Sequence, residues 1–258
     1  TELCMMIADQ INSDRDRFKT TTLNIDQLDE LRIAALLHDT GKITTPEHII
    51  NKSTRLEAII DRIELVKARL TIHQLETELA QANAQIGAQA PATPSGPDGR
   101  PFSDDEMTDT LTLLHHINTC ADHVSTENQE ILDRLQKETV TVMGTPQPIL
   151  SSDERMHLNI QKGTLSDEER EKINQHAVVT TKILNSLPWP KKLANLPYIA
   201  GAHHEKLDGS GYPNQLTGDQ LTLQARILAV ADIFEALSAV DRPYKESIPI
   251  ETTLKILQ

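Results

Sequence analysis

The chain has 258 residues, enough to bury a substantial core in one large domain or two small ones. Its formal net charge of −13 excludes a broad surface for duplex DNA, RNA or an anionic membrane, because each requires clustered positive charge. The two cysteines, Cys4 and Cys120, are too few for a disulfide framework and indicate a reducing cytoplasm. No apolar run reaches the roughly 18 residues of a membrane span, and no signal peptide is visible.

Nearly the whole sequence has helical periodicity, and no convincing run of alternating β-type residues is found, so we expect an all-α fold. Asn24 with Gln27 predicts a helix start, and Gly41 is expected to end that helix. Ser166 with Glu169 predicts a capping box. The expected helices cover residues 1–12, 25–40, 54–86, 104–139, 166–187, 192–204 and 220–240.

The segment 54–86 carries apolar residues at alternating spacings of three and four, beginning with Leu56, Ile59, Ile63 and Val66. This spacing is typical of one arm of a helical hairpin or of a short coiled coil. Residues 87–103 are rich in Pro and Gly, which predicts a flexible loop.

Three motifs carry chemistry. The first is HDTGK at 38–42, the second is HHEKLDGSGYP at 203–213, and the third is Asp232 inside the apolar run ILAVADIF. Adjacent imidazole and carboxylate groups can ligate metal together. A lone carboxylate in an apolar helix must meet a cation or become protonated. The histidines also have plainer interpretations. His38 could be a core histidine, and His203 with His204 a surface pair. His176, in the expected helix 166–187, could be a hydrogen-bonded core residue.

In this order, the motifs resemble the HD-GYP family, the bacterial branch of the HD metal phosphohydrolases that cleaves cyclic dinucleotides. The match covers residues 24–56 and 160–246. It implies a helical HD-domain bundle and two divalent transition-metal ions, iron first, with Mn, Ni and Zn as alternatives. The metal ligands implied are His38, Asp39, His176, His203, His204 and Asp232.

The resemblance also assigns the groups around the metal. Lys42 would act with Asp39 in catalysis and stabilise the leaving 3′ oxygen, while Glu235 would hold a ligand or Lys42 in place. The substrate would contact the loop and a cationic clamp, formed by Gly209, Gly211, Tyr212, Pro213, Arg242 and Lys245. Relatives carry one more histidine before the HD motif, and residues 1–37 contain none, so the resemblance supports two ions and leaves a third in doubt.

A single Lys-x-Gly-x-Leu joint in HD-GYP relatives corresponds to two segments here, 52–56 and 162–165. We therefore expect a discontinuous catalytic domain, 1–56 with 160–258, and an inserted helical hairpin, 57–159. Two copies are expected to pair through the inserted helices. The chain is expected to be a fragment with a sensory region fused upstream.

The expected function is hydrolysis of cyclic di-GMP to linear 5′-pGpG in the cytoplasm, and 3′,3′-cyclic GMP-AMP is the alternative substrate. A hypothesis of another class is a receptor that binds the dinucleotide without cleaving it. A general HD nucleotidase is less consistent with the Gly-Tyr-Pro loop.

Overall fold

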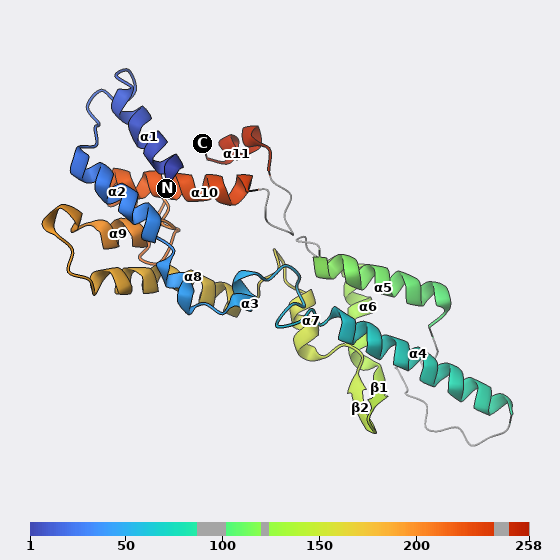
Figure 1. Ribbon diagram of the computed structural model, residues 1–258. Helices are drawn as coiled ribbons and strands as arrows, with labels where there is room; N and C mark the ends of the chain where they lie inside the picture. The colour runs from blue at the N-terminus through green and yellow to red at the C-terminus, as the bar shows by residue number, and fades with distance from the viewer. Residues whose placement is uncertain (87–101, 120–123, 240–247, 258) are drawn as a thin grey trace. The chain divides into compact units, whose positions relative to one another are not determined.

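The computed structural model of the chain describes residues 1–86, 102–119, 124–239 and 248–257. Within them, α-helices dominate and only one small two-stranded sheet occurs, which confirms the expected all-α class (Figure 1). The helices are α1 Glu2–Ser13, α2 Ile25–Leu37, α3 Glu47–Ile50, α4 Ile63–Gln85, α5 Asp104–Thr119, α6 Thr126–Lys137, α7 Ser152–Leu158, α8 Asp167–Asn185, α9 Leu196–Gly201, α10 Leu223–Ser238 and α11 Ile250–Ile256. Two 3-10 turns, η1 Thr40–Thr44 and η2 Lys191–Leu193, and the strands β1 Thr139–Val142 and β2 Thr145–Pro148 complete the structure.

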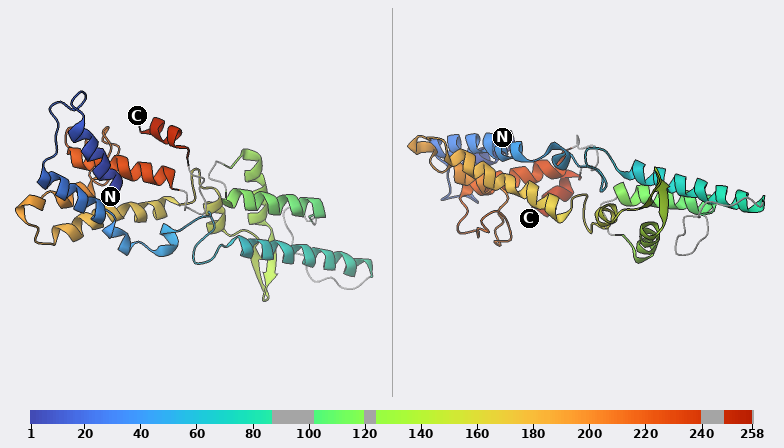
Figure 2. Two further views of the ribbon diagram at one scale, coloured as in Figure 1. Left: turned by 45° about the horizontal axis from the view of Figure 1, so that its top comes forward. Right: turned by 90° about the horizontal axis from the view of Figure 1, so that it is seen from below.

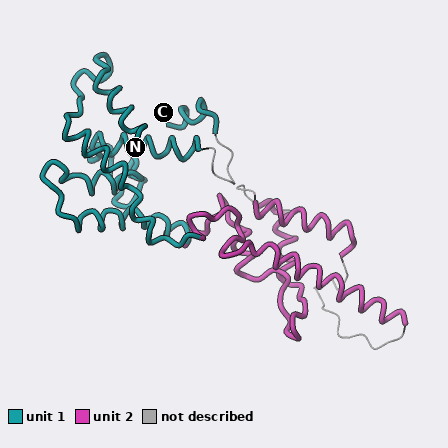
Figure 3. The backbone as a smooth tube through the Cα atoms, viewed as in Figure 1, with its two compact units in different colours: residues 1–47, 169–258 teal, residues 48–168 magenta. Residues whose placement is uncertain are grey.

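The chain forms two compact units, shown in different colours in Figure 3. Unit 1 comprises Thr1–Glu47 and Glu169–Gln258, and unit 2 comprises His48–Glu168. Each unit has its own apolar core. Whether unit 2 was inserted into an older joint, with boundaries at 57 and 159, stays a prediction.

In unit 1, α2 packs against α1, α9 and α10. The core between them contains apolar residues from all four helices, among them Ala8, Leu31, Leu196 and Leu228. The capping box of Asn24 and Gln27 is present, so α2 begins where the sequence predicts. The helix ends at Leu37, before Gly41.

The interpretation of Gly41 as a helix stop was therefore wrong. Gly41 lies inside η1, where a Cβ atom would fall 2.1 Å from the backbone oxygen of His176. The glycine is required because η1 and α8 approach each other closely at this point. That approach brings the HD motif against a histidine far along the chain.

In unit 2, α4 and α5 lie side by side, as both views of Figure 2 show. The long helix begins at Ile63 rather than near Thr54, because 54–62 forms a turn in which the Thr54 hydroxyl donates to Asp61 (2.8 Å). The helix expected over 104–139 is divided into α5 and α6.

The expectation that the chain contains no β-structure was wrong at one place, the hairpin of β1 and β2. Thr and Val alternate in β1, and the turn residues Met143 and Gly144 both have positive φ angles, 50° and 79°. This is the backbone of a two-residue hairpin turn. The four-residue Thr-Val alternation before Met-Gly was a signal too short to stand out in a helical sequence.

The two ends of the expected insertion meet inside unit 2. The buried Arg55 guanidinium donates to the carbonyl oxygens of Leu158 (2.9 Å) and Gly163 (3.3 Å), and the Thr164 hydroxyl donates to that of Lys52 (3.4 Å). Most of the predicted loop 87–103, namely 87–101, lies outside the described residues. No helix within the described ranges has the length and apolar character that crossing a membrane requires.

Candidate metal centre

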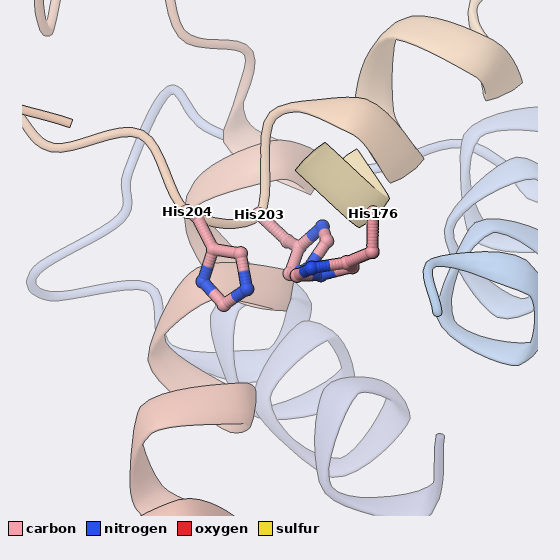
Figure 4. Close-up of side chains that lie close together, drawn as sticks. All are labelled: His176, His203 and His204. Atoms are coloured by element: carbon pink, nitrogen blue, oxygen red, sulfur yellow. The ribbon is translucent and has the colours of Figure 1, made fainter. Parts of the chain in front are cut away.

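Six side chains from four separate segments of the chain converge in unit 1. His38 follows α2, Asp39 precedes η1, His176 lies in α8, His203 and His204 follow α9, and Asp232 lies in α10. Figure 4 shows the imidazoles of His176, His203 and His204 gathered together. The structure thus brings together all six residues that the family resemblance implies as metal ligands.

Asp39 lies at the middle of the cluster. Its Oδ1 is 3.4 Å from His176 Nε2 and 3.9 Å from His203 Nε2, and its Oδ2 is 3.3 Å from His38 Nε2. Asp232 lies near two of the imidazoles, with Oδ1 3.6 Å from His38 Nε2 and Oδ2 3.9 Å from His204 Nδ1. Two overlapping donor groups could hold metal, one formed by His176, His203 and His204, the other by His38, Asp39 and His203.

Three of the imidazoles are oriented by their own helices. Nδ1 of His38, His176 and His203 lies 3.1, 2.5 and 2.6 Å from the carbonyl oxygen three residues earlier. A carbonyl oxygen can only accept a hydrogen bond, so Nδ1 carries the proton and Nε2 points to the centre. Metal-binding histidines in proteins are oriented by this kind of hydrogen bond.

The donor set fits a divalent transition metal. His176 Nε2 and His203 Nε2 are 3.3 Å apart, and in the neutral rings both are acceptors. Asp39 Oδ1 is buried and has no hydrogen-bond partner among the described residues, although the Nε2 atoms of His176 and His203 lie 3.4 and 3.9 Å from it. A cation shared by these nitrogen and oxygen atoms would satisfy both features, and mixed imidazole and carboxylate ligands suit Fe, Mn, Ni and Zn.

The carboxylates are ionised. Burial alone would raise the pKa of Asp39, but hydrogen bonds from His38 and Lys42 hold it well below its ordinary value. Burial likewise opposes ionisation of Asp232, and His38 together with His203 lowers its pKa instead. Of the two outcomes open to a carboxylate in an apolar helix, Asp232 therefore adopts the charged one.

The imidazoles divide into two kinds. Burial disfavours charge on His38, but hydrogen bonds to Asp232 and Asp39 outweigh it and raise its pKa to about 9. Burial lowers the pKa of His176, that of His203 to about 3 and that of His204 to about 4. The last three rings are neutral at physiological pH, which is the form that binds metal.

Thr180 holds the HD motif against α8, and sequence reasoning missed it. Its buried hydroxyl accepts from the Gly41 backbone N–H (2.9 Å) and donates to the His38 carbonyl oxygen (2.9 Å). One side chain thus fixes the backbone on both sides of Asp39. The only sequence signal was its position one turn after His176 on the same helix face.

The Gly-Tyr-Pro loop is held by Glu205, which sequence reasoning also left without a role. The buried Glu205 carboxylate accepts from the backbone N–H groups of Asn214 (2.6 Å) and Leu216 (2.9 Å). Gly211 has no room for a side chain, since a Cβ atom would lie 2.4 Å from the backbone nitrogen of Lys206. Gly209, also expected to contact substrate, has a φ angle of 76°.

Tyr212 lies beside the cluster. Its ring centroid is 4.8 Å from that of His204, with the two planes tilted by 31°. Burial, together with the charges of Asp232 and Asp39, raises the pKa of Tyr212 to about 12, so the phenol stays protonated. Its cis peptide bond to Pro213 forms the exit of the loop.

Two interactions expected around the cluster are the contact of Glu235 with a ligand or with Lys42, and the cationic clamp of Arg242 and Lys245. Lys42 Nζ pairs with Asp39 Oδ2 at 2.7 Å rather than with Glu235. Glu235 lines a pocket of about 420 Å³ together with His38 and Asp232, and its carboxylate has no hydrogen bond within the described ranges. Arg242 and Lys245 belong to 240–247, which is not described, so the clamp stays a prediction.

Two family models described as HD domain match this chain, over residues 1–91 and 149–258. The chain therefore belongs to the HD-domain family. Its Gly-Tyr-Pro loop and its relatives identify the HD-GYP branch within that family.

The chain is similar to several curated proteins. A 3′3′-cGAMP-specific phosphodiesterase 3 of Vibrio cholerae is 47% identical over 96 residues, 37% of this chain and 20% of that protein. The cyclic di-GMP phosphodiesterase response regulator RpfG of Xanthomonas campestris is 37% identical over 98 residues, 38% and 25% of the two lengths. A cyclic di-GMP phosphodiesterase of Pseudomonas aeruginosa is 30% identical over 150 residues, 55% and 33%. The chain thus spans at most a third of these relatives.

Proposed function

We propose that this chain is a metal-dependent phosphodiesterase that opens the ring of a cyclic dinucleotide. The observation that carries the proposal is the cluster around Asp39, in which His38, His176 and His203 direct Nε2 at two carboxylates. Such a donor set, beside the Gly-Tyr-Pro loop, fits phosphodiester hydrolysis better than the binding of a purely structural metal ion.

The cluster would hold two ions, because it contains two donor groups, which share only His203. Iron is the first expectation, with Mn, Ni and Zn as alternatives that the same ligands accept. When bound, such ions supply positive charge for the phosphate oxygens and lower the pKa of a water molecule.

The remaining residues bind and orient the substrate. The Lys42 ammonium, paired with Asp39 at 2.7 Å, is close enough to the centre to donate to the leaving 3′ oxygen. Gly209 and Gly211 allow the loop to approach the dinucleotide, and the neutral Tyr212 offers a ring face and a donor. Arg242 and Lys245 would bind phosphate in a chain whose net charge of −13 otherwise repels it.

The substrate is cyclic di-GMP, yielding linear 5′-pGpG, or 3′,3′-cyclic GMP-AMP. Relatives named for each substrate support both, since 3′3′-cGAMP-specific and cyclic di-GMP enzymes match the chain. We place the reaction in the cytoplasm, since two cysteines are too few for a disulfide framework. A homodimer formed through 57–159 and a sensory region fused upstream belong to the same proposal.

The test combines metal analysis with chromatography of the products from both cyclic dinucleotides. Metal-loaded chain is expected to convert at least one of them to its linear form. Asp39→Asn should lose metal and activity together, because it removes the charge at the middle of the cluster. His116→Ala, an exposed histidine of unit 2, is the matched control and should change neither. Metal-loaded protein that binds a dinucleotide without cleaving it would show a receptor instead.

A further inference from the structure

Helix α4 has two apolar faces, and only one of them is used inside unit 2. The inner face includes Ile63, Val66 and Leu70, which are buried in the core of that unit. The opposite face carries a second apolar stripe at spacings of three and four. Its seven residues are Leu65, Ala68, Ile72, Leu75, Leu79, Ala82 and Ile86.

This outer stripe is exposed. The five large side chains retain 37% to 78% of their accessible surface, and both alanines are exposed as well. Single exposed leucines are normal on a protein surface, but an uninterrupted 3-4 stripe over six steps is the sequence pattern of a coiled-coil seam.

The volumes of the side chains along the stripe favour the same stripe of a second copy, in antiparallel orientation, as the partner. In an antiparallel pair of α4 helices with its two-fold axis between Ile72 and Leu75, Leu65 would face Ala82 of the second copy. By the same symmetry Ala68 would face Leu79, and Ile72 would face Leu75. The Leu65–Ala82 and Ala68–Leu79 layers thus combine residues of complementary volume, and two large side chains fill each of the central layers. A parallel pair would instead place Ala68 against Ala68 and Ala82 against Ala82, leaving two poorly filled layers.

The charges beside the stripe agree with this register. On one flank Glu64 would lie opposite Gln85 of the second copy, and Thr71 opposite Glu78. On the other flank Glu76 would lie opposite Arg69, which within its own chain also binds Glu154 (2.6 Å). No like charges oppose each other in any of these pairs.

We propose that the outer stripe of α4 forms an antiparallel, two-fold symmetric contact with the same stripe of a second copy of this chain. The contact makes the protein a dimer through unit 2 and leaves the metal centre, which lies wholly in unit 1, outside the contact. The inference is independent of the reaction that unit 1 catalyses.

Sedimentation velocity of the full chain over a range of concentrations tests the dimer. The wild-type chain should show a concentration-dependent dimer, and Leu75→Glu should weaken association at least tenfold, because two carboxylates would enter the central layers. Gln81→Glu is the matched control, since it adds the same charge to an exposed position of α4 off the stripe and should leave association unchanged. Circular dichroism of all three proteins establishes that they are folded. A wild-type monomer at every concentration, or equal association of the two variants, overturns the proposal.

Disulfide trapping tests the orientation. Oxidising a mixture of Leu65→Cys and Ala82→Cys chains should give a mixed cross-linked dimer, while each variant alone gives little. The unsubstituted chain, which keeps Cys4 and Cys120, is the oxidation control. Efficient cross-linking of each variant with itself would show a parallel pair and overturn the antiparallel arrangement, because residues 65 and 82 would then lie about 25 Å apart along the helices.

Discussion

At the scale of single residues, the centre depends on groups that hold ligands as much as on the ligands themselves. His38, His176 and His203 each direct Nε2 inward because Nδ1 is hydrogen-bonded one turn back along the chain. Thr180 holds the peptide on both sides of Asp39. These contacts use backbone groups and one hydroxyl, so no metal-ligand motif in the sequence predicts them.

Thr180→Val should lower metal affinity about tenfold to a hundredfold, the usual cost of losing a group that orients a ligand. The replacement keeps the volume but leaves the Gly41 N–H unpaired and frees the His38 carbonyl. A titration that measures the amount of bound metal directly, without an activity assay, gives the affinity. Thr180→Ser, which keeps the hydroxyl, should restore most of the affinity. A valine variant that binds metal as tightly as the wild-type chain would contradict the role assigned to Thr180.

Lys42→Ala should lower kcat with metal content unchanged, because the ammonium acts on the leaving oxygen rather than on the metal. A loss of about tenfold to a thousandfold is expected for a group that acts in the transition state. Steady-state kinetics with metal analysis of the same sample separate the two quantities. Lys192→Ala removes an exposed lysine that pairs with Asp29 and should leave kcat unchanged. Loss of metal in the Lys42 variant would instead show that its ion pair holds Asp39 in place.

At the scale of elements, α4 of unit 2 contains a buried polar group that sets a pH dependence. His73 has neither ring nitrogen hydrogen-bonded within the described residues, and its Nε2 is 4.0 Å from Glu138 Oε2. Burial lowers the pKa of His73, against the opposing charges of Glu138 and Glu76, while Arg134 adds to the lowering. The unfolded chain therefore binds a proton to this histidine more readily than the folded unit does.

Because the folded pKa lies below the unfolded value of 6.5, unit 2 should lose stability as the pH falls through 6.5 toward the folded pKa. The slope attributable to His73 is at most about 1.4 kcal/mol per pH unit. Urea unfolding between pH 5 and pH 8 measures it, and His73→Leu should flatten the curve in that window. His116→Ala, an exposed histidine, should leave the curve as it is. Identical pH profiles for wild type and His73→Leu would show that another group titrates.

At the scale of the whole molecule, two units with separate cores predict two unfolding transitions. Divalent metal should raise only the transition of unit 1, since all six candidate ligands lie there. At a free metal concentration a hundred times the dissociation constant the gain is about 2.7 kcal/mol. Calorimetry with and without metal, together with hydrogen exchange to assign each transition, checks this. A single transition, or an equal shift of both, would contradict the independence of the units.

The sequence alone determined the helical class, and its motifs predicted the six candidate ligands and their chemistry. Periodicity of 3.6 residues records the buried face of each helix locally, and the capping box of Asn24 and Gln27 is a contact between neighbours in the chain. The motifs HDTGK and HHEKLDGSGYP pack several donors into a few residues, so their chemistry could be recognised before any fold was known. The short β1–β2 hairpin and the start of α4 were missed because their local signals were weak.

Only the tertiary structure decided how those donors are held. Gly41 was interpreted as a helix stop, whereas its real constraint is the His176 backbone 2.1 Å from where a Cβ would lie. Thr180 acts on Gly41, which packing brings to it from 139 positions away along the chain. Glu205 acts on the backbone of its own loop, 9 and 11 positions further on. The outer stripe of α4 has the same periodicity as the inner one. Periodicity alone cannot tell a face buried in the fold from a face left exposed, because that depends on which other elements pack against the helix.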